Sequence, residues 1–283
     1  GVAAFHPEAT KFAALASGLR RAQGMSYFNI GGNAGYAAAP ILMTPLVLWL
    51  GLEGGLVAAV PVIACALFLW RYQPRLRALE ATGSLRIFDG VDRPAAMTVL
   101  TFVVLLRTVA WFALLTFVPL WIVSEGGTKG EGNRDLAVML VSGAIGTLLI
   151  GRIADRLGLR ATLIVTQVAI APLMLVFVLV GGVAGTIALA FIGMCVVGTF
   201  GVTTVLGQRY LPCHVGVAAG LTIGLAIGLG GVTAVAVGAV ADAIDLQTAL
   251  LACTVAPLIG VFFCLALPSP DAPARLAPEP LTS

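Results

Sequence analysis

The sequence predicts an all-α membrane protein, and three observations support this: the composition, the length of the apolar runs and the placement of the basic residues. Hydrophobic residues make up 59% of the 283 residues and charged residues only 10%, whereas a soluble domain carries about 25% charged residues. An α-helix crosses a hydrocarbon core of about 30 Å in about twenty residues. Apolar runs of that length recur along the chain, without the alternation that the strands of a membrane barrel require.

Eight runs are long enough to span a bilayer as helices. The predicted spans lie near residues 24–50, 54–71, 96–122, 135–151, 161–181, 183–206, 216–241 and 246–267. The lipid bilayer is therefore the first expected partner of the chain, and we expect the chain to cross it many times.

The basic residues orient these spans. Thirteen of the 16 lysines and arginines fall in the terminal segments and connections on one side of the proposed topology. The opposite side carries only Lys129 and Arg134, and Arg107 lies inside a span. Basic residues accumulate on the cytoplasmic side of membrane proteins, so both ends of this chain are expected in the cytoplasm. The net charge of +3 is then an orientation signal and predicts no nucleic-acid partner.

The five cysteines predict neither a disulfide framework nor a metal site. They are scattered, mostly within apolar runs, with no Cys-x-x-Cys pair and no histidine at ligand spacing. No cofactor is expected.

The charged segment 151–160, with the sequence GRIADRLGLR, joins two apolar runs. A glycine at its start permits close helix packing, Asp155 offers a carboxylate to backbone N–H groups, and the arginines stay in water. The segment resembles the cytoplasmic loop signature of the major facilitator superfamily, Gly-x-x-Ala/Gly-Asp-Arg-x-Gly-x-Arg. The positions that match it are Gly151, Ala154, Asp155, Arg156, Gly158 and Arg160.

We assign a gating role to this hairpin. A carboxylate at Asp155 can accept hydrogen bonds at the positive N-terminus of the 24–50 span, near Ala22 to Gly24, and so hold the inner side closed. The predicted gating residues are Gly151, Asp155, Arg156, Gly158 and Arg160.

Two related helix bundles are expected. Three glycines in the span 24–50 repeat in the span 216–241 at a constant offset of 196 residues, as parallel repeats of transporter halves do. We expect residues 1–75 to end an N-terminal bundle, 76–94 to be a cytoplasmic linker, 95–268 to form a C-terminal six-helix bundle and 269–283 to be a cytoplasmic tail. On this interpretation the chain holds the end of helix four and helices five to twelve of a major facilitator fold, and is an N-terminally truncated fragment.

Three further segments resemble the fosmidomycin-resistance group of this superfamily. They are Phe5 to Glu8, Gln23 to Gly35, and Leu211 to Asp242. The resemblance implies a drug/proton antiporter of the bacterial inner membrane. Protons and a small-molecule substrate are then the expected partners, and drug efflux that gives antibiotic resistance is the expected function. In that group an acidic residue usually follows the glutamine before the Leu-Pro step, whereas Arg209 follows Gln208 here, so no role of that acid is carried over.

Arg107 is the outstanding candidate for substrate binding. A charge near the bilayer midplane costs several kcal/mol unless it faces a cavity, a partner or a ligand. A guanidinium can anchor an anionic substrate through phosphonate or carboxylate oxygens, or it can make a structural ion pair or carbonyl contact within the bundle. Trp111 shares its helix face at i+4 and either lines the same cavity or packs.

The first bundle supplies further candidates. His6 and Glu8 bracket a proline near the inner side, and they either carry the coupling proton or tie the neighbouring turn. Asn29 and Asn33 belong to a polar stripe that faces the transport cavity or makes hydrogen bonds between helices. Gln208 either contacts substrate or makes a structural hydrogen bond.

The sequence leaves four possibilities open. The leading one is proton-coupled efflux of a small, possibly anionic, antibiotic by alternating access. The alternatives are a facilitator-type importer of a sugar, nitrate or organic anion, and an intramembrane enzyme. The chain has neither a Gly-x-Ser-Gly nor a His-Glu-x-x-His motif, so we expect no enzyme. A fourth possibility is that this 283-residue chain alone does not transport.

Overall fold

The computed structural model describes residues 51–57, 59–82 and 91–269, together with scattered positions among residues 9–50. No strand occurs in these ranges. The helices within them that are long and apolar enough to cross a membrane are Gly54–Arg75, Pro94–Ser124, Lys129–Leu157, Leu159–Leu179, Gly182–Tyr210, Val215–Ala243 and Leu246–Ala266. These seven match seven of the eight predicted spans. The remaining predicted span, 24–50, lies mostly outside the described residues.

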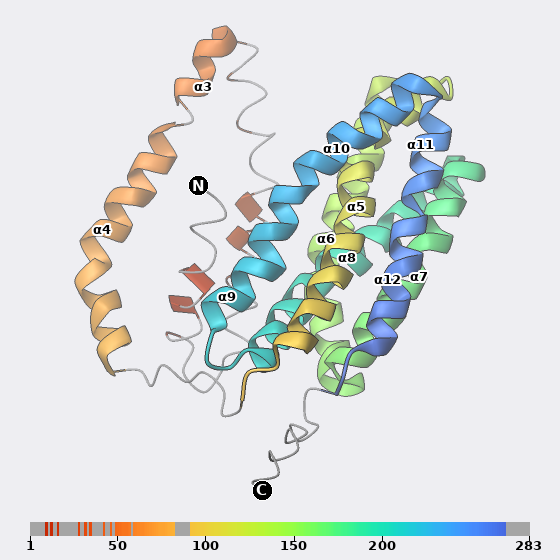
Figure 1. The fold of residues 1–283 in the computed structure, drawn as a ribbon. Coiled ribbons are helices and arrows are strands. Elements are labelled where there is room, and N and C mark those ends of the chain that lie inside the picture. The colour runs from red at the N-terminus through yellow and green to blue at the C-terminus, as the bar shows by residue number, and fades with distance from the viewer. Residues whose placement is uncertain are drawn as a thin grey trace, which may run out of the picture.

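The described chain has a short first part and a six-helix bundle. A 3₁₀ turn at Gly51–Glu53 leads into α3 (Gly54–Val57) and α4 (Ala59–Thr82), which lie apart from the bundle (Figure 1). The bundle contains α5 (Pro94–Ser124), α6 (Lys129–Leu157), α7 (Leu159–Leu179), α8 (Gly182–Tyr210), α9 (Val215–Ala219), α10 (Leu225–Ala243), α11 (Leu246–Cys253) and α12 (Val255–Ala266). Helix α4 runs to Thr82, so the first residues of the predicted 76–94 linker are helical.

Local sequence signals set the helix boundaries. Pro94 occupies the first turn of α5, where a missing N–H is tolerated. Thr128 and Glu131 form a capping box at the start of α6, in which the Thr128 N–H donates to Glu131 Oε2 at 2.7 Å. Gly158, with φ of +87°, separates α6 from α7 in a conformation that favours glycine.

The two ends of the bundle take their names from two of its turns. The Gly158 end contains the turn between α6 and α7, and the Gly181 end contains the connection between α7 and α8.

Two predicted spans are interrupted. The 216–241 span consists of α9, a π-helical turn at Gly220–Gly224 and α10. The last span breaks at Thr254 between α11 and α12. Pro257 accounts for that break, since a proline lacks the amide N–H and its ring collides with the carbonyl four residues earlier.

Helices α6 and α8 pack backbone against backbone along a seam of glycines. A Cβ added at Gly146 would lie 2.6 Å from Met194 Cα, and one at Gly198 would lie 2.8 Å from the Gly146 carbonyl oxygen. A Cβ at Gly193 would collide with the Met139 carbonyl. Small residues at such an interface let helices approach closely in lipid, so this seam holds α6 and α8 as one unit.

The glycines of α10 differ in how closely they approach the other described helices. A Cβ at Gly228 or Gly231 would meet no heavy atom within 4 Å, whereas one at Gly230 would collide with the ring of Phe112 on α5. Helix α10 therefore turns Gly230 toward α5, and Gly228 and Gly231 make no close contact with the described helices.

Candidate substrate and gating sites

Arg107 lies near the middle of the 31-residue helix α5, at the centre of its buried face, and is only 1% exposed. Its Nη1 donates a hydrogen bond to Thr199 Oγ1 on α8, and its guanidinium lies over the Phe200 ring, 5.1 Å from the ring centroid. The Thr199 hydroxyl in turn donates to the Cys195 carbonyl at 2.7 Å. The charge is therefore held between α5 and α8 in the interior of the bundle.

Two nitrogens of this guanidinium have no hydrogen-bond partner among the described residues. They are Nε and Nη2, which form one edge of the planar group. A buried donor that is left unpaired costs about 1–3 kcal/mol, and more when it is charged. The described helices thus fix one side of Arg107 and leave a pair of adjacent donors for another group.

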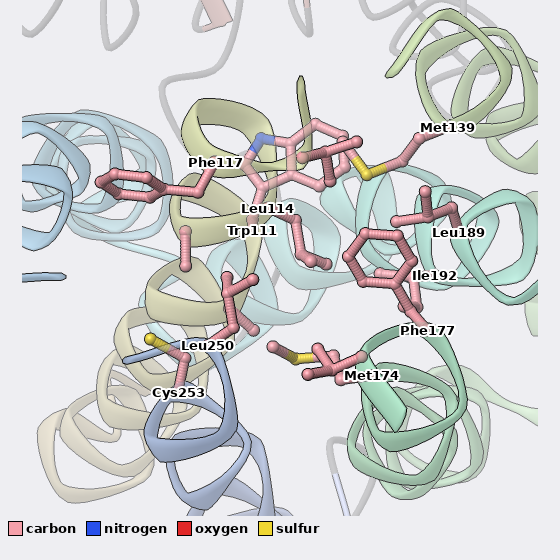
Figure 2. Close-up of a cluster of buried hydrophobic side chains, with 14 of the residues drawn as sticks. Trp111, Leu114, Phe117, Met139, Met174, Phe177, Leu189, Ile192, Leu250 and Cys253 are labelled. Carbon is pink, nitrogen blue, oxygen red and sulfur yellow. The ribbon is translucent and has the colours of Figure 1, made fainter. Parts of the chain in front are cut away.

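Trp111 takes part in the hydrophobic core one turn from Arg107. It is 7% exposed and belongs to a cluster with Leu114 on α5 and Met139 on α6. Figure 2 shows this cluster, to which α7, α8 and α11 also contribute side chains. Of the two predicted roles for Trp111, the position matches packing.

Two glutamines add further unpaired polar atoms inside the described bundle. Gln208, near the end of α8, is 2% exposed, and its Nε2 has no partner there. Gln167 on α7 is 1% exposed; its Nε2 donates to the Pro257 carbonyl at 3.3 Å, while its Oε1 is unpaired among the described groups. Buried polar groups therefore occur on α5, α7 and α8.

The remaining predicted binding and coupling residues are not placed. His6, Glu8, Asn29 and Asn33 lie outside the described residues. Their roles in proton coupling and substrate contact stay predictions.

The predicted gating hairpin forms the turn between α6 and α7. Asp155 and Arg156 are exposed, and Gly158 makes the turn itself. Arg160 donates from Nη2 to the Leu265 carbonyl at 2.8 Å, which ties the hairpin to the end of α12. The predicted partners of Asp155, Ala22 to Gly24, lie outside the description. A Cβ at Gly151 would meet nothing within 4 Å, so Gly151 makes no close approach to any described helix.

Comparison with known proteins settles the family. A model of the Major Facilitator Superfamily matches residues 1–233. The chain belongs to the Major Facilitator Superfamily. Members of this superfamily are membrane transporters and not enzymes, so a multi-pass membrane protein with a transport role is established.

Two curated relatives are similar over most of this transporter chain. The uncharacterized MFS-type transporter YfnC of Bacillus subtilis is 32% identical over 280 residues, which cover 95% of this chain and 68% of YfnC. The fosmidomycin resistance protein of Escherichia coli is 24% identical over 270 residues, which cover 92% of this chain and 66% of that protein. The chain thus spans about two thirds of the length of these relatives.

Solved transporter structures share the fold. The superfamily transporter FucP in the outward conformation aligns with a TM-score of 0.70 at 15% identity, over 93% of this chain and 72% of FucP. A structure of the E. coli fucose:proton symporter FucP aligns with a TM-score of 0.56 at 19% identity, over 62% of this chain and 43% of that one. At these identities the likeness concerns the fold alone.

The structure of the transporter reveals a network at the Gly158 end that the sequence analysis missed. The Tyr210 hydroxyl donates to the Pro268 carbonyl at 2.6 Å, and the Arg93 N–H donates to the Tyr210 carbonyl at 2.7 Å. Asp92 accepts from the Cys213 N–H at 2.9 Å and pairs with His214. Burial alone would raise the pKa of Asp92, but these hydrogen bonds and the charge of His214 outweigh it and hold that pKa below its ordinary value. The partners are more than 50 residues apart, so no local spacing indicated them.

A buried carboxylate at the Gly181 end was also missed. Asp135 on α6 is 3% exposed and accepts hydrogen bonds from Arg134 at 3.0 and 3.2 Å and from the Thr186 hydroxyl of α8 at 3.0 Å. From sequence alone, an acidic residue next to an arginine at the start of a span looks like an exposed ion pair. Its burial is visible only once α8 is in place.

Proposed function

We propose that this chain is the larger part of a proton-coupled exporter of a small anionic antibiotic that works by alternating access. Membership of the superfamily supports transport, and similarity to a protein named for fosmidomycin resistance supports efflux of a drug. The observation that supports an anionic substrate is the edge of Arg107 formed by Nε and Nη2, which has no partner among the described residues.

The geometry of Arg107 suits an oxyanion. The Nε and Nη2 edge of a guanidinium presents two parallel donors, which match two oxygens of a carboxylate or phosphonate. Thr199 binds Nη1 and the Phe200 ring lies against the face of the group, so the Nε and Nη2 edge is fixed in direction before a ligand arrives. Such preorganisation reduces the entropy that binding has to overcome.

The coupling and gating roles complete the proposed cycle. A change in protonation at His6 or Glu8 shifts the balance between inward-facing and outward-facing states. Contact of Asp155 with the start of the 24–50 span closes the inner side, and loss of that contact opens it. Arg107 binds the substrate between these steps.

Replacement of Arg107 tests this function in the full-length gene product expressed in a drug-sensitive bacterial host. Arg107→Leu should abolish resistance to fosmidomycin while the protein remains in the membrane, because loss of a paired buried charge weakens binding by about 2 kcal/mol or more, roughly thirtyfold. Arg107→Lys should retain only part of the resistance, since an ammonium lacks the two-donor edge.

Arg152→Leu is the matched control, because Arg152 is an exposed arginine in the hairpin that donates only to the Leu148 carbonyl of its own helix. Resistance should persist in this variant. Unchanged resistance in Arg107→Leu would contradict the role of Arg107 as the anchor.

A further inference from the structure

The side chain of Gln167 on α7 is buried, and only one end of its amide has a partner. Its Nε2 donates to the Pro257 carbonyl at 3.3 Å, whereas its Oε1 has no partner among the described residues. The other unpaired side-chain atoms of the described bundle are nitrogens, on Arg107, Arg160 and Gln208. An apolar side chain would fill the same space without burying an unpaired acceptor, which is unfavourable. The amide oxygen of Gln167 therefore calls for a further partner.

The neighbours of Gln167 fix the orientation of its amide. A carbonyl oxygen can only accept a hydrogen bond, so the amide turns Nε2 toward Pro257 and Oε1 away from it. Gly260 makes room for this arrangement, because a Cβ there would lie 2.3 Å from Gln167 Nε2 and 3.3 Å from its Cδ. Helix α12 thus holds the amide in one orientation and leaves a buried acceptor on its other side.

Gln167 and Arg107 approach the same face of α12. Helices α7 and α12 lie side by side, and α12 also packs against α5 (Figure 1). The position of a Cβ at Gly260 is only 3.6 Å from the Cβ of Leu106 on α5, the residue before Arg107. Cys264, one turn further along that face of α12, is buried and interacts electrostatically with Arg107. The amide and the guanidinium therefore meet the same stretch of α12, at the junction of α5, α7 and α12.

The two groups have opposite hydrogen-bonding capacities. Arg107 presents the donors Nε and Nη2, and Gln167 presents the acceptor Oε1, yet none of these atoms has a partner among the described residues. An ionised carboxylate or phosphonate group suits the donors of Arg107, but it only accepts hydrogen bonds and cannot satisfy Oε1. A ligand that satisfies both groups carries an O–H or N–H donor in addition to its acidic group.

We propose that Gln167 determines substrate specificity by accepting a hydrogen bond from a hydroxyl or N–H group of an anionic substrate whose acidic group binds Arg107. The proposal rests on the anionic substrate of the proposed function. It narrows the substrate class from small anions to anions that also carry a hydrogen-bond donor. The competing role is a purely structural one, in which Gln167 only braces the break in the last span through Pro257.

Binding of defined phosphonates to the purified full-length transporter tests the proposal without any transport. The probes are a short series of ω-hydroxyalkylphosphonates and the methyl ether of each, which keeps the oxygen but lacks the donor. Affinities follow from the rise of the unfolding midpoint in detergent with probe concentration. For the chain length that fits best, we expect the hydroxyl compound to bind at least about tenfold more tightly than its ether, because the ether leaves Oε1 unpaired.

Replacement of Gln167 shows whether its amide causes this preference. Gln167→Leu should bind the hydroxyl compound and its ether with equal affinity, and Gln167→Asn, whose amide is withdrawn by one methylene, should lose most of the preference. A purely structural brace would instead lower the unfolding midpoint of the ligand-free variant and leave the tenfold ratio unchanged. Gln247→Leu is the matched control, because Gln247 is an exposed glutamine of α11, and it should keep the wild-type ratio.

Three results would overturn the proposal: no probe raises the midpoint of the wild type, the hydroxyl compound and its ether bind the wild type equally, or the preference persists in Gln167→Leu. If Gln167→Leu does not fold, an unchanged ratio in Gln167→Asn has the same force. Arg107→Leu separates this proposal from the proposed function. Wild-type affinity for the phosphonates in that variant would refute the anchor, whereas the ratio of hydroxyl compound to ether reports on Gln167 alone.

Discussion

At the residue scale, the position of Arg107 was predictable but its partners were not. A single arginine within an apolar span indicates a functional or paired charge whatever the fold. Thr199 is 92 residues further along the chain and resembles any other threonine in a helix. The sequence therefore singled out Arg107 as a candidate anchor, and only helix packing revealed that α8 holds one side of its guanidinium, while Nε and Nη2 have no partner among the described residues.

Asp92 lies outside the membrane spans, and we expect its contribution to stability to depend on pH. Its pKa in the folded protein lies below the ordinary value of 3.8, so its interactions stabilise the fold above that pH and are lost as the pH falls through the folded pKa. Asp92→Asn should lower the free energy of unfolding at neutral pH by about 0.5–1 kcal/mol, as expected for a partly exposed pair. The difference should vanish in strong acid.

Thermal unfolding in detergent at neutral and strongly acidic pH measures this effect. Asp242→Asn serves as the control and should match the wild type at both. An equal loss of stability in Asp92→Asn at both pH values would show that the charge of Asp92 is not responsible.

At the element scale, the composition and length of the apolar runs predicted the seven described spans. The breaks within two of these spans became visible only in the structure. The π-helical turn at Gly220–Gly224 joins α9, which packs against α8, to α10, which packs against α5, and no periodicity of the sequence encodes it. Glycine positions alone likewise did not distinguish the seam of α6 and α8 from the open stripe on α10, because both contain glycines at helical spacing.

Alanine substitutions separate these two kinds of glycine. Gly193→Ala should destabilise the bundle by about 1–3 kcal/mol, since the new methyl group collides with the Met139 carbonyl and the backbone must move. Gly228→Ala adds a methyl group that meets no described atom within 4 Å and should be neutral or stabilising by up to about 1 kcal/mol. Unfolding midpoints of the two variants in one detergent give the comparison, and equal midpoints would refute the close packing of α6 on α8.

At the scale of the whole molecule, the fold class and the family were predictable from the sequence because lipid imposes strong rules. Every span must satisfy its own backbone groups, and basic residues sort to one side. The division into two bundles, the linker at 76–94 and the cytoplasmic location of both ends of this chain stay predictions.

One transport measurement on the full-length gene product tests the proposed direction of export, the proton coupling and the role of Arg107 together. In inverted membrane vesicles, an exporter moves its substrate into the lumen, and an acidic lumen supplies the protons that leave in exchange. Radiolabelled fosmidomycin should accumulate in such vesicles when the lumen is acidic, should stop accumulating when the pH gradient is collapsed, and should not accumulate with Arg107→Leu. Accumulation that is independent of the pH gradient, or that is equal in the wild type and Arg107→Leu, would contradict a proton-coupled exporter anchored on Arg107.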